Sequence, residues 1–172
     1  NATYMKLDRV ELGLSQAIVR RSYAQLKSVS NHLRAYDPSP VARFQPKILD
    51  GNHLAGTEHR LLETRGTTAA PLPGKTLVVL DPRREAIADL FPIEDGHAQE
   101  RSGLDAVIET IEAGDLWIAD RNFCTLKFLY AIARKCGRLV IRLHDKMKGE
   151  QLGSRRYCGK TASGRVYEYQ LK

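Results

Sequence analysis

Three consecutive segments in the second half of the chain constrain its fold most. Residues 116–120 contain an apolar run with the length of a buried strand, and so do residues 138–143. Between them, residues 125–136 have the apolar spacing of a helix. Two strands joined through a helix pair in parallel, because the helix returns the chain to the starting end of the sheet. The sequence therefore predicts an α/β fold containing parallel strands.

The remaining elements are predicted from the same kinds of pattern. Apolar residues at near-helical spacing indicate helices, short apolar runs indicate strands, and Gly or Pro clusters indicate turns. We expect helices over 10–33, 54–64 and 98–112, and strands over 47–50, 76–81 and 85–91. The first of these strands would end at Asp50, because the following Gly51-Asn52 pair favours a turn. Asp81 precedes Pro82 and two arginines, which predicts a hairpin turn there.

Charge is distributed unevenly along the chain. Residues 1–120 carry 14 basic and 17 acidic side chains (net −3), whereas residues 121–172 carry 13 basic and 3 acidic side chains (net +10). Such a density of positive charge favours nucleic-acid binding, with a solvated basic face as the alternative. Four glycines punctuate the stretch after Asp145, and residues 166–171 alternate in polarity, which predicts the start of a β-rich insertion. We expect a helical segment and linker over 1–40, a core over 41–145 and this insertion over 146–172.

Several classes of protein are disfavoured by composition. No apolar run approaches the ~18 residues of a membrane span, and the first residues lack a signal peptide, so we expect no membrane partner and a cytoplasmic location. The three cysteines form no Cys-x-x-Cys pair, which predicts reduced thiols and argues against a zinc site. The chain starts at Asn1 and stops within a strand-like pattern, so we expect it to be a piece of a longer protein.

Two aspartates are the first candidates for a functional site. Asp50 and Asp120 each follow an apolar run and precede a turn, and the ends of strands are where α/β sheets form their sites. Carboxylates brought side by side repel each other unless a cation lies between them, and hard oxygen ligands suit Mg²⁺ or Mn²⁺. The alternative is that each aspartate only caps the helix that follows it.

An ordered series of motifs resembles the DDE transposases of bacterial insertion sequences, in their cut-and-paste branch. The motifs are ILDGN at 48–52, EHRL at 58–61, HAQER at 97–101, LWIADRNFC at 116–124 and VIR at 140–142. The resemblance covers about residues 40–172. It implies an RNase H-like mixed sheet flanked by helices, preceded by a helical segment and followed by a β-rich insertion. It also implies Mg²⁺-dependent or Mn²⁺-dependent cleavage and transfer of DNA strands.

By this resemblance, Asp50 and Asp120 correspond to the first two acidic residues of the family's catalytic triad and would hold the metal. The third is a glutamate in a helical Tyr-Arg-Glu-Lys motif beyond the insertion, and this sequence has no such motif. After Asp120 the only acids are Asp145, Glu150 and Glu168, and none lies in a matching helical pattern. The resemblance therefore implies a fragment of the catalytic domain, which we expect to bind DNA without cutting it.

Further residues are assigned around this site. Arg121 and Arg142 are candidates for contacts with DNA phosphates, and Asn122 and Glu100 for orienting the metal ligands; in each case an ordinary turn or surface residue is the alternative. In the basic end, the candidates for phosphate contacts are Lys146, Lys148, Arg155 and Arg156. The implied partners are the element's ends and its target DNA, with a homodimer in the synaptic complex of the whole protein, acting at the bacterial nucleoid. A metal-dependent nuclease or resolvase of the RNase H-like group, or a non-catalytic DNA-binding remnant, are the alternatives.

Overall fold

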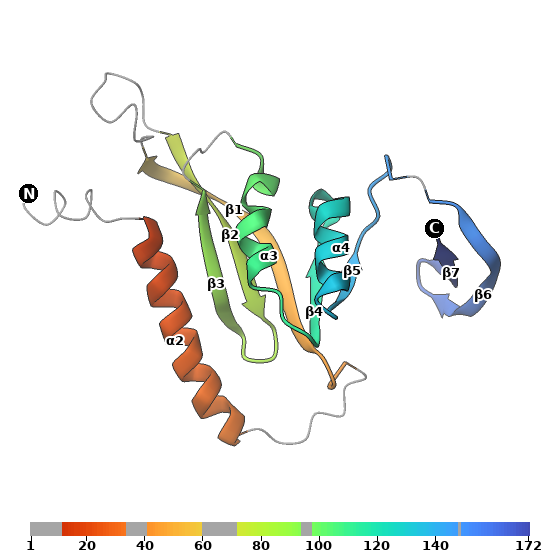
Figure 1. Cartoon of the computed structure of the whole chain (residues 1–172), viewed down its shortest axis with the longest axis horizontal. Coiled ribbons are helices and arrows are strands. Elements are labelled where there is room, and N and C mark those ends of the chain that lie inside the picture. Colours follow the sequence, from red (N-terminus) through yellow and green to blue (C-terminus); the bar gives the residue numbers. More distant parts are fainter. Residues whose placement is uncertain (1–11, 34–40, 60–71, 94–97, 148) are drawn as a thin grey trace, which may run out of the picture. The chain divides into compact units, whose positions relative to one another are not determined.

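The computed structural model describes residues 12–33, 41–59, 72–93, 98–147 and 149–172 (Figure 1). The chain forms two compact units, Asn1–Arg142 and Leu143–Lys172. The first contains a mixed sheet and its helices, and the second is a β-hairpin. No helix within the described ranges is long and apolar enough to cross a membrane. The predicted division of the chain into a helical segment, a core and an insertion, with boundaries at residues 40 and 145, stays a prediction.

A five-stranded sheet with the order β3-β2-β1-β4-β5 forms the centre of the first unit. Its strands are β1 (Gln45–His59), β2 (Leu72–Asp81), β3 (Ala86–Ile93), β4 (Asp115–Ala119) and β5 (Arg138–Ile141). The first three form an antiparallel meander, while β4 and β5 add in parallel on the other side of β1. The predicted parallel strands are confirmed, and the sheet with its flanking helices has the expected RNase H-like arrangement.

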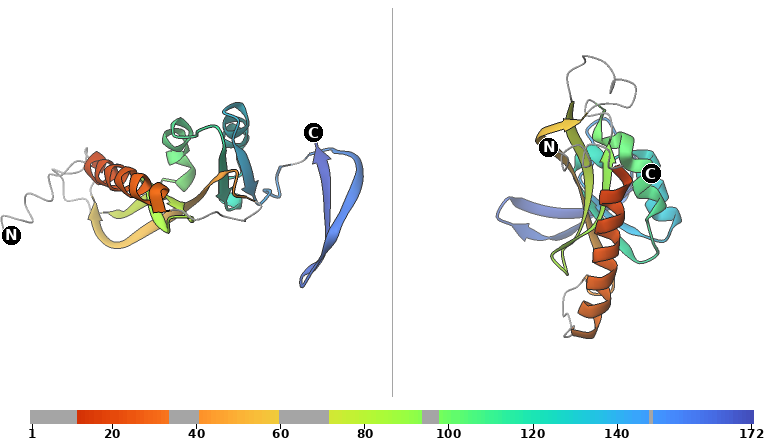
Figure 2. Two further views of the ribbon diagram at one scale, coloured as in Figure 1. Left: turned by 90° about the horizontal axis from the view of Figure 1, so that it is seen from below. Right: turned by 90° about the vertical axis from the view of Figure 1, so that its left-hand side faces the viewer.

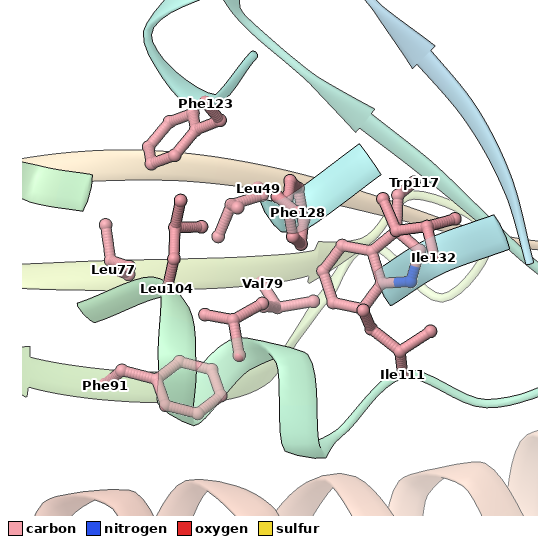
Figure 3. Packing of buried hydrophobic residues seen from close by; sticks show 11 residues of the cluster. Leu49, Leu77, Val79, Phe91, Leu104, Ile111, Trp117, Phe123, Phe128 and Ile132 are labelled. Atoms are coloured by element: carbon pink, nitrogen blue, oxygen red, sulfur yellow. The ribbon is translucent and has the colours of Figure 1, made fainter. Parts of the chain in front are cut away.

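Two helices, α3 (Leu104–Glu109) and α4 (Leu126–Arg134), cover one face of this sheet (Figure 2). The helix α4 begins after Thr125, whose hydroxyl accepts the N–H of Phe128 at 3.3 Å. Between sheet and helices lies a continuous apolar core, made up of Leu49, Leu77, Val79, Phe91, Leu104, Val107, Ile111, Trp117, Phe123, Phe128 and Ile132 (Figure 3). Trp117 and Phe128 meet edge to face at its centre, with ring centroids 5.8 Å apart.

The predicted helix at the start of the chain is confirmed as α2 (Leu12–Leu33), and polar side chains connect it to the sheet. Arg20 donates to both carboxylate oxygens of Asp89 in β3, at 2.9–3.0 Å. The Tyr23 hydroxyl donates to Asp81 Oδ2 at 2.7 Å. Most large apolar side chains of α2 are exposed to solvent, Ile18 by 57% and Leu33 by 79%, whereas Val19 is half-buried. This helix is therefore held on the β2–β3 hairpin by hydrogen bonds and ion pairs.

Three predictions of local structure are wrong. Asp50 does not end a strand, because β1 continues to His59 through antiparallel pairing with β2. For the same reason residues 54–59 are strand instead of the start of the helix predicted over 54–64; residues 60–64 lie outside the described ranges. The helix predicted over 98–112 is shorter: it begins as the 3₁₀ turn η2 (Glu100–Gly103), and α3 ends at Glu109.

The second unit is an antiparallel hairpin of β6 (Gln151–Thr161) and β7 (Gly164–Leu171). The alternating pattern over 166–171 lies in β7, which is regular, whereas β6 contains two bulges where its register with β7 shifts. Large side chains of the hairpin are exposed on both strands.

Candidate functional site

The parallel strands bring three of the predicted site residues into one row. The parallel pairing of β1, β4 and β5 ends at Leu49, Ala119 and Ile141, which lie side by side in the sheet. The next residues along the three strands are Asp50, Asp120 and Arg142. Neighbouring strands lie about 4.8 Å apart, so this row carries two carboxylates and a guanidinium on successive strands. We call these three residues the register row.

Both carboxylates of the register row are on the sheet face away from α3 and α4. Leu49 is 1% exposed in the core, and Ala119 packs against the same core. Side chains alternate between faces along extended backbone, so Asp50 points to the opposite face. Asp120 keeps an extended conformation, with φ −76° and ψ 176°, so the alternation reaches it too. Both aspartates are solvent-exposed and accessible to a ligand.

A second group of contacts connects the two aspartate-bearing segments on the helix side of the sheet. The carboxylate of Glu100 accepts a hydrogen bond from Asn122 Nδ2 at 2.7 Å. It also lies against the backbone of Gly51, where an added Cβ would be 2.5 Å from Oε1 and 2.8 Å from Oε2. Glu100 therefore spans from the residue after Asp50 to the turn after Asp120. Gly51 was missed from the sequence, because only this close approach distinguishes it from a turn glycine.

Asp120 has a structural role as well as its place in the row. Its Oδ1 accepts the backbone N–H of Asn122 at 2.8 Å and caps the 3₁₀ turn η3 (Arg121–Phe123). Asp50 Oδ1 accepts the N–H of Gly51 at 2.9 Å, but no helix follows it. The capping interpretation therefore applies to Asp120 alone. A carboxylate has about four acceptor positions, so this single bond leaves capacity for other donors or a cation.

The donor set of the row suits a hard divalent cation. Within the described ranges, no group of three or more His, Cys, Asp or Glu side chains is arranged to hold a metal ion. Mg²⁺, however, usually takes one or two carboxylates from the protein and completes its shell with water and substrate phosphates. Asp50 and Asp120 supply ligands of that kind and number.

The predicted basic contacts are distributed over both units. In the first unit, Arg121 is half-buried at the start of η3. In the second unit, Lys146 is exposed, and its backbone N–H donates to His144 Nδ1 at 3.1 Å. Arg155 and Arg156 are exposed on β6 with different neighbours, as described below. Lys148 lies outside the described ranges.

A cavity of about 190 Å³ lies at the other end of the same strands. It is bordered by α2 and by the first residues of β1 and β4, including Gln45 and Asp115. Asp115 is 1% exposed and pairs with Lys47 Nζ at 2.8 Å. The cavity is therefore separated from the register row by the length of β4, and it contributes nothing to that site.

Of the comparisons with known proteins, the one with solved structures gives a match. No model of a known protein family matches the chain, and no curated protein does. Among solved structures, the chain is similar to the piggyBac transposase in the cryo-EM structure of its synaptic complex with hairpin DNA. The sequences are 13% identical, the TM-score is 0.41, and the match covers 74% of this chain and 32% of that chain. This chain thus spans about a third of that protein's length.

Proposed function

We propose that this chain is part of the catalytic domain of a transposase, in which Asp50 and Asp120 hold a divalent metal for DNA strand cleavage and transfer. The observation that carries the proposal is the register row, which puts these two carboxylates on adjacent parallel strands of an RNase H-like sheet. They are separated by 70 residues in sequence, so their alignment is a property of the fold. The motif series of bacterial insertion-sequence transposases supports the same assignment.

The chain's own residues would act by binding and orientation. Mg²⁺ or Mn²⁺ at the two carboxylates would stabilise charge on the reacting phosphate. Asn122 fixes Asp120 through its backbone N–H, and Glu100 fixes the side chain of Asn122. Arg142 follows Ile141 at the end of the row, where a guanidinium provides paired donors suited to phosphate oxygens.

The partner in this proposal is DNA, both the element's ends and the target. The excess of ten positive charges over residues 121–172 supplies a sequence-independent attraction to phosphate. In the whole protein the synaptic complex would contain two copies.

Mn²⁺ binding by the whole 172-residue chain tests the proposal, with calorimetry as the readout. We expect Asp50→Asn and Asp120→Asn each to abolish the binding. Glu109→Gln, which removes an exposed carboxylate at the end of α3, is the matched control and should leave binding unchanged. Equal Mn²⁺ affinity in all three variants would refute the assignment of the ligands.

A nicking assay on DNA carrying candidate element ends tests the chemistry separately. Without the family's third glutamate, the chain should bind duplex DNA and leave it uncut. Metal-dependent cleavage that is lost in Asp50→Ala and Asp120→Ala would show that another carboxylate completes the site. Metal-dependent cleavage that is never followed by joining of the cut end to a target would favour the nuclease alternative.

A further inference from the structure

The two faces of the β6–β7 hairpin differ sharply in side-chain chemistry. On β7, which is regular, Arg165, Tyr167 and Tyr169 alternate onto one face, and Val166, Glu168 and Gln170 onto the other. The partner strand follows the register: Tyr157 is opposite Tyr167, Arg156 is opposite Glu168, and Lys160 is opposite Arg165. The bulge between Tyr157 and Gly159 lets Tyr157 and Lys160 share a face although they are three residues apart.

One face therefore gathers tyrosines and cations, and we call it the tyrosine face; its residues are Arg155, Tyr157, Lys160, Arg165, Tyr167 and Tyr169. Tyr157 and Tyr167 contact each other with ring centroids 5.6 Å apart. The Arg155 guanidinium lies over the Tyr169 ring, 5.3 Å from its centroid. The three rings remain 42–57% exposed.

The opposite face is close to neutral. Arg156 lies on this face, and its Nε donates a hydrogen bond to Glu168 Oε2 at 3.0 Å. The hydrogen bond and charge of Arg156 lower the pKa of Glu168, so the pair stays ionised and mutually neutralised at neutral pH. Arg155 and Arg156, adjacent in sequence, thus have different environments.

The cations of the tyrosine face have no acidic partner among the described residues. Lys160 and Arg165 are directly opposite each other across the strands, and like charges in that position repel. Bound phosphate would relieve this repulsion. Aromatic rings beside such cations add a second kind of contact, because nucleic-acid bases stack on them regardless of sequence.

We propose that the tyrosine face is a binding site for single-stranded nucleic acid, with unpaired bases stacked on the tyrosines and phosphates held by Arg155, Lys160 and Arg165. The proposal rests on the proposed function, in that it takes DNA as the partner, and it adds which face of the hairpin binds and which form of DNA. Duplex DNA keeps its bases stacked inside, and an acidic protein offers no series of flat rings, so neither matches the three exposed tyrosines as well.

The test measures binding of the whole chain to a labelled oligothymidylate of about 12 nucleotides, a length within the range of comparable stacking sites. Fluorescence anisotropy at fixed salt gives the affinity. Tyr169→Leu should weaken binding roughly five- to hundredfold, the range for loss of one base–aromatic stack. Gln170→Leu, the same substitution type at a neutral, exposed residue on the opposite face, is the matched control and should leave the affinity unchanged. Unchanged affinity in Tyr169→Leu, or equal loss in Gln170→Leu, would overturn the proposal.

Two further measurements separate stacking from plain electrostatics. Heparin, a polyanion without bases, should bind Tyr169→Leu as well as the parent chain. Photocrosslinking of the parent chain to an oligonucleotide that contains 5-iododeoxyuridine should label Tyr157, Tyr167 or Tyr169. Mass spectrometry identifies the labelled residue, and the measurement does not depend on the folding of a variant. Crosslinks confined to other residues would refute the site. If the chain binds duplex DNA and Tyr169→Leu does not change oligothymidylate binding, this proposal is rejected and the proposed function is unaffected.

Discussion

Gly51 shows how one small residue permits a site to form between distant segments. Its missing side chain leaves room for the Glu100 carboxylate, which in turn holds Asn122 beside Asp120. The motif around residues 48–52 therefore contains a steric requirement in addition to its aspartate. A side chain at position 51 would displace Glu100 and loosen the turn that carries Asp120.

We expect Gly51→Ala to lower the free energy of unfolding by about 1 kcal/mol, because the methyl group meets only the end of the flexible Glu100 side chain, which moves aside and loses its hydrogen bond to Asn122. Glu100→Ala in the same chain should remove most of that loss, because the methyl group then has space. A double-mutant cycle in urea measures the coupling between the two sites. Simple additivity of the two substitutions would contradict the close approach.

Half-buried Tyr23 forms a small network with the buried Asp81 and Arg84 side chains, which the sequence did not reveal. Burial, the hydrogen bond to Asp81 and the Asp81 charge raise the pKa of Tyr23 to about 12. Burial alone would raise the pKa of Asp81 too, but hydrogen bonds from Tyr23, Arg84 and the Arg83 N–H, with the Arg84 charge, outweigh it and lower the pKa below its ordinary value of 3.8.

These shifts predict where stability depends on pH. A tyrosine whose pKa is raised on folding stabilises the protein fully below pH 10, and this contribution is lost as the pH rises toward 12. Tyr23→Phe should therefore flatten the fall in unfolding free energy over that interval, and Tyr130→Phe, at a ring that is 66% exposed, should not. Urea unfolding followed by Trp117 fluorescence measures both. Identical pH profiles for the two variants would contradict the network.

The contribution of Asp81 to the free energy of unfolding depends on pH in the opposite direction from that of Tyr23. It is present above about pH 3.8 and disappears as the pH falls through the lower pKa of the folded protein. In Asp81→Asn, the decline of unfolding free energy below pH 4 should be shallower than in the parent chain. A decline of unchanged steepness would show that other carboxylates account for it.

Among the elements, those with strong local patterns were predictable and those that depend on pairing were not. The runs 116–120 and 138–143 and the helix between them follow from composition and spacing alone. In contrast, the Gly51-Asn52 pair stays extended because β2 pairs with it, and no local pattern reveals that partner. Asp50 and Asp120 were chosen from the sequence because each follows an apolar run, whereas their alignment with Arg142 depends on the register of the parallel strands. The faces of Arg155 and Arg156 likewise depend on bulges in β6 that the sequence does not mark.

The polar attachment of α2 makes its stability unusually dependent on individual ion pairs. Arg20→Gln removes three hydrogen bonds to Asp89 and leaves the carboxylate of that buried residue without its cation. We expect a loss of about 1–2 kcal/mol and faster hydrogen exchange in α2. Arg21→Gln, at an exposed neighbouring position, is the control and should change neither. Unchanged exchange in Arg20→Gln would show that α2 is held by other contacts.

At the scale of the whole molecule, the two units are stabilised in different ways. The first has the continuous apolar core, whereas a two-stranded hairpin is marginally stable alone. Trp117, the single tryptophan, is 0% exposed within that core, so its fluorescence reports the first unit only. Evidence of order in the hairpin must come from a residue-resolved measurement such as amide hydrogen exchange.

Phe128→Ala tests this separation. The ring is 0% exposed and contacts Trp117, so its removal should cost about 3–5 kcal/mol in the Trp117-detected transition. Amide hydrogen exchange in β6 and β7 should change little in the same variant. Equal destabilisation in both measurements would show that the units unfold together.

The strand order also determines a sequence of events during synthesis. The antiparallel meander β1–β2–β3 joins neighbours along the chain, but β1 cannot acquire its parallel partner until residue 119 has left the ribosome. Contacts of such long sequence separation form late, since closing the intervening loop costs entropy before any pairing compensates. Nascent chains stopped before β4 should therefore contain a sheet with one unpaired edge at β1, where premature association with another chain is most favourable.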